Sequence, residues 1–202
     1  MKIKNVVFDI GGVLLEWNPL SLLTAMFDPE KARILKASMM DSKYWADLDK
    51  GILTIEEAVQ IFSKKIPDFK KDIEFALHGF VDYLPIIEEN VNILYNLAKD
   101  DYRLFVLSNF HDDSFTKAYK KFDFFRIFEG LVISSRVKMI KPEKEIYHYL
   151  LNKYELKPVE TVFFDDSEAN VTTALDLNIC GVYTPTPHEL VAFYNKNFKK
   201  ER

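Results

Sequence analysis

Five short apolar runs constrain the fold of this chain more than any other feature. None of them alternates apolar with polar residues, and unbroken runs are typical of strands buried on both faces of a parallel sheet. The runs occupy residues 5–10, 103–108, 130–134, 161–166 and 179–184. Between the runs, residues 86–99 and 143–154 carry apolar side chains at helical spacing. Alternating strands and helices predict an α/β fold with a doubly wound parallel sheet.

The gap between the first and second runs is far longer than one crossover helix needs. Residues 19–83 fill it with helical patterns and with no convincing strand. One of these patterns opens with Thr54 and Glu57 at capping-box spacing and stops before Pro67. We therefore expect residues 1–15 and 85–202 to form the α/β core, and residues 16–84 to form an inserted helical cap subdomain.

Composition narrows the classes of partner. The chain has 27 Lys and Arg against 31 Asp and Glu, and this net charge of −4 argues against a nucleic-acid partner. We find neither a leader pattern nor an apolar run of about 18 residues, so we expect a cytoplasmic protein without a membrane partner. Cys180 is the single cysteine, which excludes an internal disulfide, and we expect it to be a small buried hydrophobe. The sequence leaves the oligomeric state open.

Polar residues stand where three of the five predicted strands end. Asp9 ends the first strand, Ser108 and Asn109 end the second, and Asp165 and Asp166 end the fourth. Each has an ordinary structural explanation when taken alone, as a helix cap or a turn residue. However, ligands of an open parallel sheet bind beyond the carboxyl ends of its strands. We therefore expect these side chains to converge on one edge of the sheet.

Three converging carboxylates would repel one another strongly in a confined site unless a cation were present. Oxygen ligands suit a hard ion such as Mg²⁺, which completes its octahedron with water and phosphate oxygens. Lys141 precedes Pro142, a position that disfavours helix, so we expect it in the loop before the next helix. Lys141 and the Ser108 hydroxyl would then supply positive charge and a donor for a phosphoryl group.

This set of motifs resembles the haloacid dehalogenase superfamily of phosphatases and phosphotransferases. "FDIGGVL" resembles the first motif, "VLSN" the second, "IKPEKEIY" the third and "FFDDSEAN" the fourth. The inserted helices resemble the family's cap, so the likeness covers essentially all of the chain. Within the family the chain is most similar to the Asp-x-Gly-x-Val subgroup, which includes bacterial sugar-phosphate phosphatases and resembles the phosphatase domain of soluble epoxide hydrolases. The resemblance implies the strand order 5-4-1-2-3.

The resemblance also implies a mechanism. Asp9 would be the nucleophile that forms an aspartyl-phosphate, which water then hydrolyses. The implied metal site consists of Asp9, the Gly11 carbonyl and Asp166, with Asp165 as a further carboxylate that either approaches the Mg²⁺ ion or supports its ligands. Lys141 would neutralise charge, and Ser108 and Asn109 would orient the phosphoryl oxygens. Gly12 fits a tight loop close to the ligand. The implied activity is hydrolysis of a small phosphomonoester, with a sugar phosphate as one candidate.

Gly11 departs from the family pattern, which has a second Asp at this position as acid and base toward the leaving group. General acid–base help is worth about 10²- to 10⁴-fold, whereas phosphoryl transfer depends mainly on positioning and charge stabilisation. The missing acid would therefore slow hydrolysis least for substrates with stable leaving groups, such as sugar 1-phosphates or acyl phosphates. Two alternatives stay open: a metal-free 2-haloacid dehalogenase, and a catalytically weak binding protein with a phosphatase fold.

Several residues near the motifs are expected to have structural roles. His111, Asp112 and Asp113 are interpreted as caps of the following helix. Trp17 and Trp45 are interpreted mainly as packing residues. His148 lies off the apolar stripe of its helix and is expected to be exposed. None of these residues is assigned to the site.

Overall fold

The computed structural model describes residues 2–100 and 102–199. Its sheet contains β1 (Asn5–Phe8), β2 (Arg103–Ser108), β3 (Gly130–Ile133), β4 (Thr161–Asp165) and β5 (Cys180–Tyr183). Neighbouring strands are all parallel and follow the order β3-β2-β1-β4-β5. The predicted fold class and the implied strand order are confirmed. Because β1 is central and pairs with β2 and β4, the carboxyl ends of these strands are neighbours.

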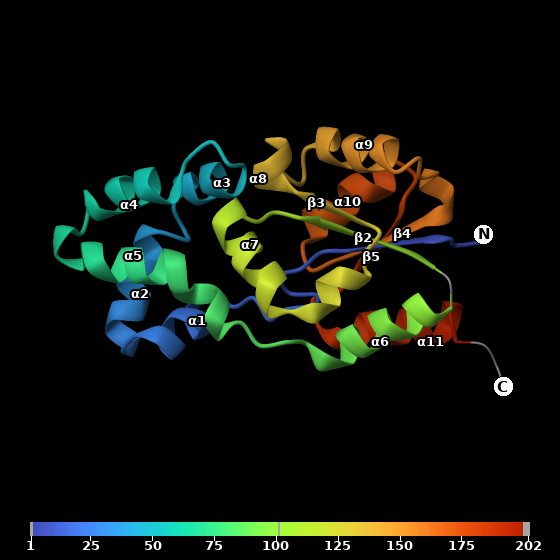
Figure 1. Ribbon diagram of the computed structural model, residues 1–202, viewed down its shortest axis with the longest axis horizontal. Helices are drawn as coiled ribbons and strands as arrows, with labels where there is room; N and C mark the ends of the chain where they lie inside the picture. Colours follow the sequence, from blue (N-terminus) through green and yellow to red (C-terminus); the bar gives the residue numbers. More distant parts are fainter. Residues whose placement is uncertain (1, 101, 200–202) are drawn as a thin grey trace.

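Helices cover both faces of the sheet (Figure 1). They are α6 (Glu88–Lys99), α7 (Asp112–Lys121), α8 (Ser134–Val137), α9 (Lys144–Lys153), α10 (Glu168–Asp176) and α11 (Pro187–Asn197). Val7, Phe105 and Phe163 point to the face packed by α9 and α10. Val6 and Phe8 point to the opposite face, which packs on α6, α7 and α11. Strand side chains thus alternate between two apolar layers, which explains why the runs lack polar residues.

Between β1 and β2, a group of helices occupies residues 19–83 before the chain returns to the core at α6. We call residues 19–83 the insertion. Its helices are α1 (Pro19–Met26), α2 (Pro29–Ser38), α3 (Lys43–Asp49), α4 (Ile55–Ser63) and α5 (Lys70–Gly79), with 3₁₀ turns at Pro67–Phe69 and Phe80–Tyr83. The predicted capping box of α4 is confirmed, since the Glu57 N–H donates to Thr54 and the Thr54 N–H donates to Glu57. Buried residues from Leu23 to Leu77 form a separate hydrophobic cluster. This separate cluster is consistent with the predicted cap.

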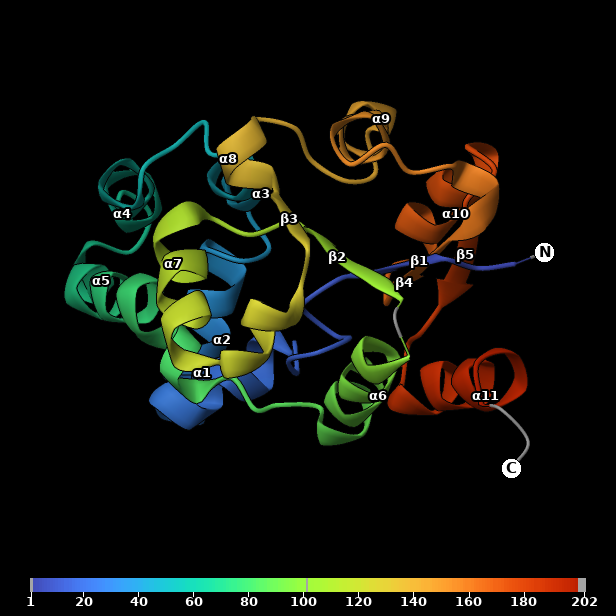
Figure 2. The ribbon, with the colours of Figure 1, turned by 45° about the vertical axis from the view of Figure 1, so that its right-hand side comes forward.

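The two connections between the insertion and the core run side by side. The Glu16 N–H donates to the Pro85 carbonyl at 2.9 Å, and the Ile87 N–H donates to the Leu14 carbonyl at 2.9 Å. Leu15 and Ile86 form an antiparallel bridge between these bonds. We call residues 14–16 and 85–87 the neck. Figure 2 shows the insertion beside the sheet, beyond this region.

One predicted strand is less buried than its sequence indicates. β5 is an edge strand, in which Cys180, Gly181 and Val182 are only partly buried and Tyr183 is exposed. The expectation of a buried Cys180 is therefore wrong, although partial burial still raises the pKa of its thiol. An edge strand has a neighbour on one side only, so an apolar run does not ensure full burial.

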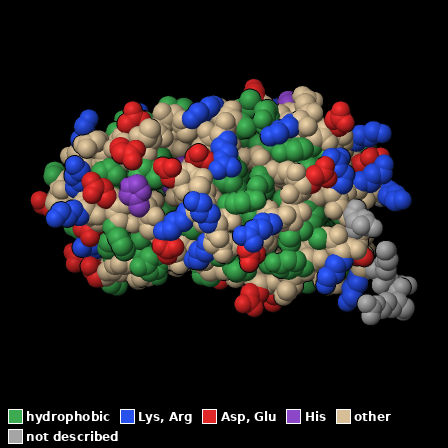
Figure 3. All heavy atoms as spheres, viewed as in Figure 1, with side chains coloured by type: hydrophobic (Ala, Val, Ile, Leu, Met, Phe, Trp, Pro, Cys, Tyr) green, Lys and Arg blue, Asp and Glu red, His purple; other side chains and the backbone are tan. Residues whose placement is uncertain are grey.

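The surface agrees with the balanced composition. On the face seen in Figure 3, basic and acidic side chains are interspersed over both the insertion and the core. Such mixing differs from the basic stripe typical of nucleic-acid binding. Within residues 2–100 and 102–199, no helix combines the length and the hydrophobicity needed to cross a membrane.

Candidate active site

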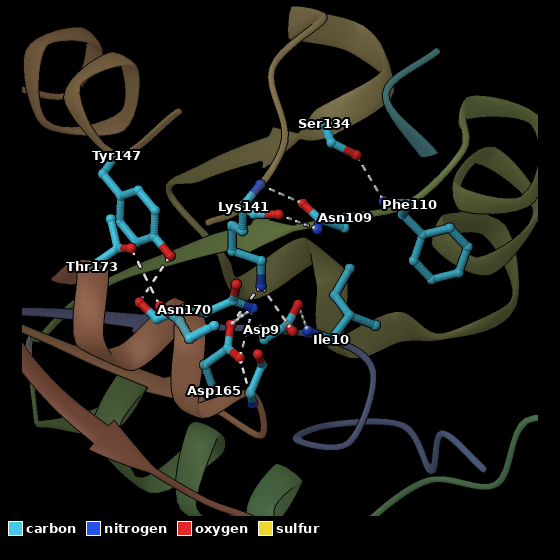
Figure 4. A network of polar contacts seen from close by, with 12 residues as sticks. Asp9, Ile10, Asn109, Phe110, Ser134, Lys141, Tyr147, Asp165, Asn170 and Thr173 are labelled. Atoms are coloured by element: carbon cyan, nitrogen blue, oxygen red, sulfur yellow. Dashed lines mark hydrogen bonds and ion pairs between the residues drawn. The ribbon is translucent and has the colours of Figure 1, made fainter. Parts of the chain in front are cut away.

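The carboxyl ends of β1, β2 and β4 bring the predicted polar residues together (Figure 4). Asp9 follows β1 and is 7% exposed, and Asp165 at the end of β4 is completely buried. Asp166 is the next residue, and oxygen atoms of Asp9, Asp165 and Asp166 lie within 4.8 Å of one another. The carboxylates that the sequence places at the ends of two strands therefore lie close together, as expected. The chemical roles of these residues remain predictions.

Lys141 lies between two of the carboxylates. Its Nζ is 2.8 Å from Asp9 Oδ2 and 2.6 Å from Asp165 Oδ2, and the residue is buried. Burial lowers the pKa of Lys141, but the Asp165 and Asp9 carboxylates outweigh this effect and raise the pKa above its ordinary value. The ammonium therefore stays charged at neutral pH. Lys141 also lies in the loop before α9, as its position before Pro142 predicts.

Asn109 fixes the backbone that carries Lys141. Its Nδ2 donates to the Lys141 carbonyl at 3.0 Å, and its Oδ1 accepts from the Lys141 N–H at 2.9 Å. Both polar groups of this side chain are thereby used for positioning the lysine. Ser108 differs, because its hydroxyl makes no hydrogen bond within the described part of the chain. Ser108 is therefore the donor at this strand end that is available to a ligand.

The carboxylates differ in how fully they are engaged. Asp165 Oδ1 accepts from the Ser167 N–H at 2.8 Å and from Asn170 Nδ2 at 2.9 Å, while Oδ2 accepts from Lys141. Asp9 Oδ1 accepts from the Ile10 N–H at 2.7 Å. The Asp166 carboxylate has no hydrogen bond or ion pair with another described residue. Asp165 thus orients Lys141, whereas Asp166 keeps oxygens available for a ligand.

The chemistry of this cluster suits a divalent cation. Burial raises the pKa of Asp9 to about 7 against the opposing effect of Lys141, and Asp165 and Asp166 add to the rise. Burial also raises the pKa of Asp166. One ammonium cannot balance three carboxylates, and an all-oxygen donor set is what Mg²⁺ prefers. The Gly11 carbonyl accepts no hydrogen bond from the described residues, so it fits the implied set with Asp9 and Asp166.

The two glycines that follow Asp9 differ in how strongly the structure requires a glycine at their positions. Gly12 has φ +71°, and a Cβ built there would lie 2.2 Å from Asp166 Oδ2. Gly12 is therefore required both by its backbone and by the close approach of Asp166, in line with the predicted tight loop. A Cβ at Gly11 would lie 3.4 Å from the Cβ and Cγ of Trp17, which is ordinary contact. The indole of Trp17 thus borders the space beside Gly11.

A cavity of about 250 Å³ opens over this cluster. The core lines it with Asp9, Gly11, Ser108, Asn109, Phe110 and His111, and Trp17, Trp45, Asp49 and Phe80 complete the wall. Trp17 and Trp45 have ring centroids 6.2 Å apart. The interpretation of these tryptophans as packing residues is therefore incomplete, because both also face the cavity. The insertion contributes directly to the site through α3.

The prediction that His111 caps α7 is wrong. His111 occupies the N-cap position but makes no capping hydrogen bond, and its buried ring lines the cavity. Asp112 pairs with Arg136 at 2.5 Å, and Asp113 is exposed. His148 is exposed as expected. The available signal for His111 was its position just beyond the carboxyl end of β2, where ligands of parallel sheets bind.

The structure thus combines a parallel α/β core, a helical insertion after the first strand and an acidic cluster at the carboxyl edge of the sheet. The family model of haloacid dehalogenase-like hydrolases matches residues 6–182, so the chain belongs to this family. The match includes both the insertion and the core. The motif resemblance is thereby confirmed.

Similar proteins include phosphatases. Sesquiterpene phosphatase astK of Aspergillus oryzae is 22% identical over 180 residues, covering 89% of each chain. Drimenol cyclase drtB of Aspergillus calidoustus is 25% identical over 190 residues, covering 89% of this chain and 34% of that protein. This chain therefore spans about a third of the cyclase. The magnesium complex of HAD family enzyme bt-2542 from Bacteroides thetaiotaomicron has a TM-score of 0.73 and 25% identity, covering 91% of this chain and 93% of that one.

Proposed function

We propose that this protein is a Mg²⁺-dependent phosphatase that hydrolyses a small phosphomonoester. The observation that carries the proposal is the meeting of Asp9, Asp165 and Asp166 around buried Lys141 at the carboxyl edge of the sheet. The phosphatase among the relatives and the magnesium complex among the solved structures support the same chemistry. The cavity beside this cluster limits the substrate to a small molecule.

In the proposed reaction the Asp9 carboxylate attacks phosphorus, the bond to the leaving group breaks, and water later hydrolyses the aspartyl-phosphate. Lys141 places a positive charge 2.8 Å from the attacking carboxylate, and Asp165 and Asn109 hold that lysine in position. The Ser108 hydroxyl donates to a phosphoryl oxygen. Mg²⁺ held by Asp9, the Gly11 carbonyl and Asp166 would neutralise phosphoryl charge.

A sugar phosphate is the substrate class that we favour. The cavity of about 250 Å³ combines aromatic walls with polar groups from Asp49 and His111, which can bind hydroxyl groups. We retain the prediction of a cytoplasmic location and of no nucleic-acid partner.

Phosphate release tests the proposal directly. The purified protein is expected to release phosphate from a panel of sugar phosphates and from p-nitrophenyl phosphate with Mg²⁺, and to lose this activity in EDTA. Asp9→Asn should abolish release because the amide cannot serve as the nucleophile. Asp68→Asn, at an exposed carboxylate of the insertion, is the matched control and should retain full activity.

The same experiment distinguishes the alternatives. Halide release from 2-chloropropionate without Mg²⁺ would favour the dehalogenase. Binding of sugar phosphates without any turnover would favour the binding protein that Gly11 suggests. Turnover that persists in Asp9→Asn would contradict the proposed nucleophile.

A further inference from the structure

We propose that His111, paired with Asp49, is the proton donor that serves the leaving group in place of a side chain at position 11. The inference rests on the proposed phosphatase function and goes beyond it, because it assigns the acid–base role to residues outside the four motifs. It also gives α3 of the insertion a part in the chemistry.

The residues around the cavity leave few candidates for this role. Among the described residues that line it, only Asp9, Asp49 and His111 carry a carboxyl or imidazole group, the kinds of side chain that usually serve as a general acid. Asp9 is the proposed nucleophile, and Gly11 has no side chain. Any acid supplied by the cavity wall must therefore come from Asp49 and His111, which contact one another there.

The proposed role requires a proton on each ring nitrogen of His111, and the contacts of the ring accommodate both. Ser114 Oγ lies 2.6 Å from His111 Nε2 and 3.4 Å from the Leu77 carbonyl. A hydroxyl that donates to this carbonyl can accept from Nε2–H. On the other side of the ring, Nδ1 lies 3.4 Å from Asp49 Oδ1. An ionised carboxylate can only accept, so a proton on Nδ1 is the arrangement that this contact favours.

The surroundings hold the ring in place at the wall of the cavity. Phe80 packs on the ring at 5.4 Å and Trp45 meets it edge-on at 5.9 Å. The backbone of Asp49 is anchored separately, since its carbonyl accepts from Ser134 Oγ at 2.5 Å. The separation between Nδ1 and Asp49 exceeds the 2.7–3.2 Å of an ordinary N–H···O bond. In the proposed reaction a substrate oxygen in the cavity takes this proton in place of Asp49.

The proposed proton transfer balances over the whole reaction. When Asp9 attacks phosphorus, the phosphorus–oxygen ester bond breaks and its electron pair stays on the leaving oxygen. That oxygen takes the Nδ1 proton and departs as an alcohol. Nδ1, now bare and facing the Asp49 carboxylate, takes a proton from the water that attacks the aspartyl-phosphate, which regenerates Asp9 and releases phosphate. The Nε2 proton stays on the Ser114 side throughout.

His111→Gln is the decisive variant, because the glutamine amide can replace Nε2–H toward Ser114 but offers nothing at Nδ1. We expect kcat on β-glycerophosphate to fall by about 10²-fold or more, the usual worth of a general acid. The fall on p-nitrophenyl phosphate should be less than about 10-fold, since its phenolate leaves without a proton. Asp49→Asn should show the same selectivity with a smaller loss.

His148→Gln, on the exposed side of α9, is the matched control and should leave both rates unchanged. Equal losses on the two esters in His111→Gln would overturn this inference and leave the proposed function standing. No phosphate release by the wild-type protein would overturn both.

A measurement without substrate guards against a variant that does not fold. Imidazole ¹⁵N shifts of the wild-type protein at neutral pH should show both nitrogens of His111 protonated, and this signature should be lost in Asp49→Asn. A bare Nδ1 in the wild-type protein would overturn the inference.

Discussion

The two sides of the cavity are built in different ways. On the core side, buried or partly buried hydrogen bonds join Lys141 to Asp165 and to Asn109, which stand at or just beyond strand ends. On the insertion side, Trp45 and Asp49 belong to a separately packed cluster of helices. Its contacts with the core include the Ser134–Asp49 hydrogen bond and the ion pairs Lys50–Glu143 and Lys117–Asp82. The residues of the acidic cluster are thus held at the ends of strands, whereas the opposite wall of the cavity is carried by a separate group of packed helices.

Among the variants that test this comparison, Lys141→Met is expected to lower stability and phosphate release the most. The variant leaves Asp9 and Asp165 buried without their cation, and breaking a buried pair costs about 3–5 kcal/mol. Urea unfolding should show this loss, and phosphate release should be abolished. Lys144→Met removes an exposed ion pair with Asp176 and should cost less than about 1 kcal/mol. Similar losses for the two variants would contradict the description of the core side as a tightly coupled network.

Gly12→Ala should have an intermediate effect. The new methyl group meets the Asp166 carboxylate, and its backbone has φ +71°, so we expect a loss of about 1–3 kcal/mol in unfolding free energy. Mg²⁺ affinity, measured by calorimetry, should fall as well because Asp166 is displaced. Gly79→Ala is the control, since a Cβ there meets only Met26 Cε at 3.6 Å. Unchanged Mg²⁺ affinity in Gly12→Ala would argue against Asp166 as a ligand.

Lys50→Met should have the smallest effect. It removes the partly exposed ion pair with Glu143 between the insertion and the core, which is worth about 0.2–1 kcal/mol. A double-mutant cycle with Glu143→Gln measures that coupling by urea unfolding. A coupling energy as large as the loss in Lys141→Met would show that the two sides of the cavity are held equally firmly.

The sequence predicts the core side better than the insertion side for a physical reason. Unbroken apolar runs imply a parallel sheet, and a parallel sheet gathers the residues at its carboxyl ends, so Asp9 and Asp166 could be placed together without coordinates. The partners of His111 could not be found in this way. Its contact with Asp49 depends on how a separate group of helices packs against the core, and local patterns do not encode that packing. The same limit applies to Asn109, whose engagement with Lys141 joins two loops far apart in the chain.

The neck gives the architecture an evolutionary consequence. Because the two segments of the neck are hydrogen-bonded to each other, the inserted chain leaves and re-enters the core at a single place. Segments of other lengths and folds can be grafted between these anchor points without altering the register of the five strands, since closing a longer loop adds little entropic cost. The wall that the insertion adds to the cavity can then change while the acidic cluster at the strand ends stays in place.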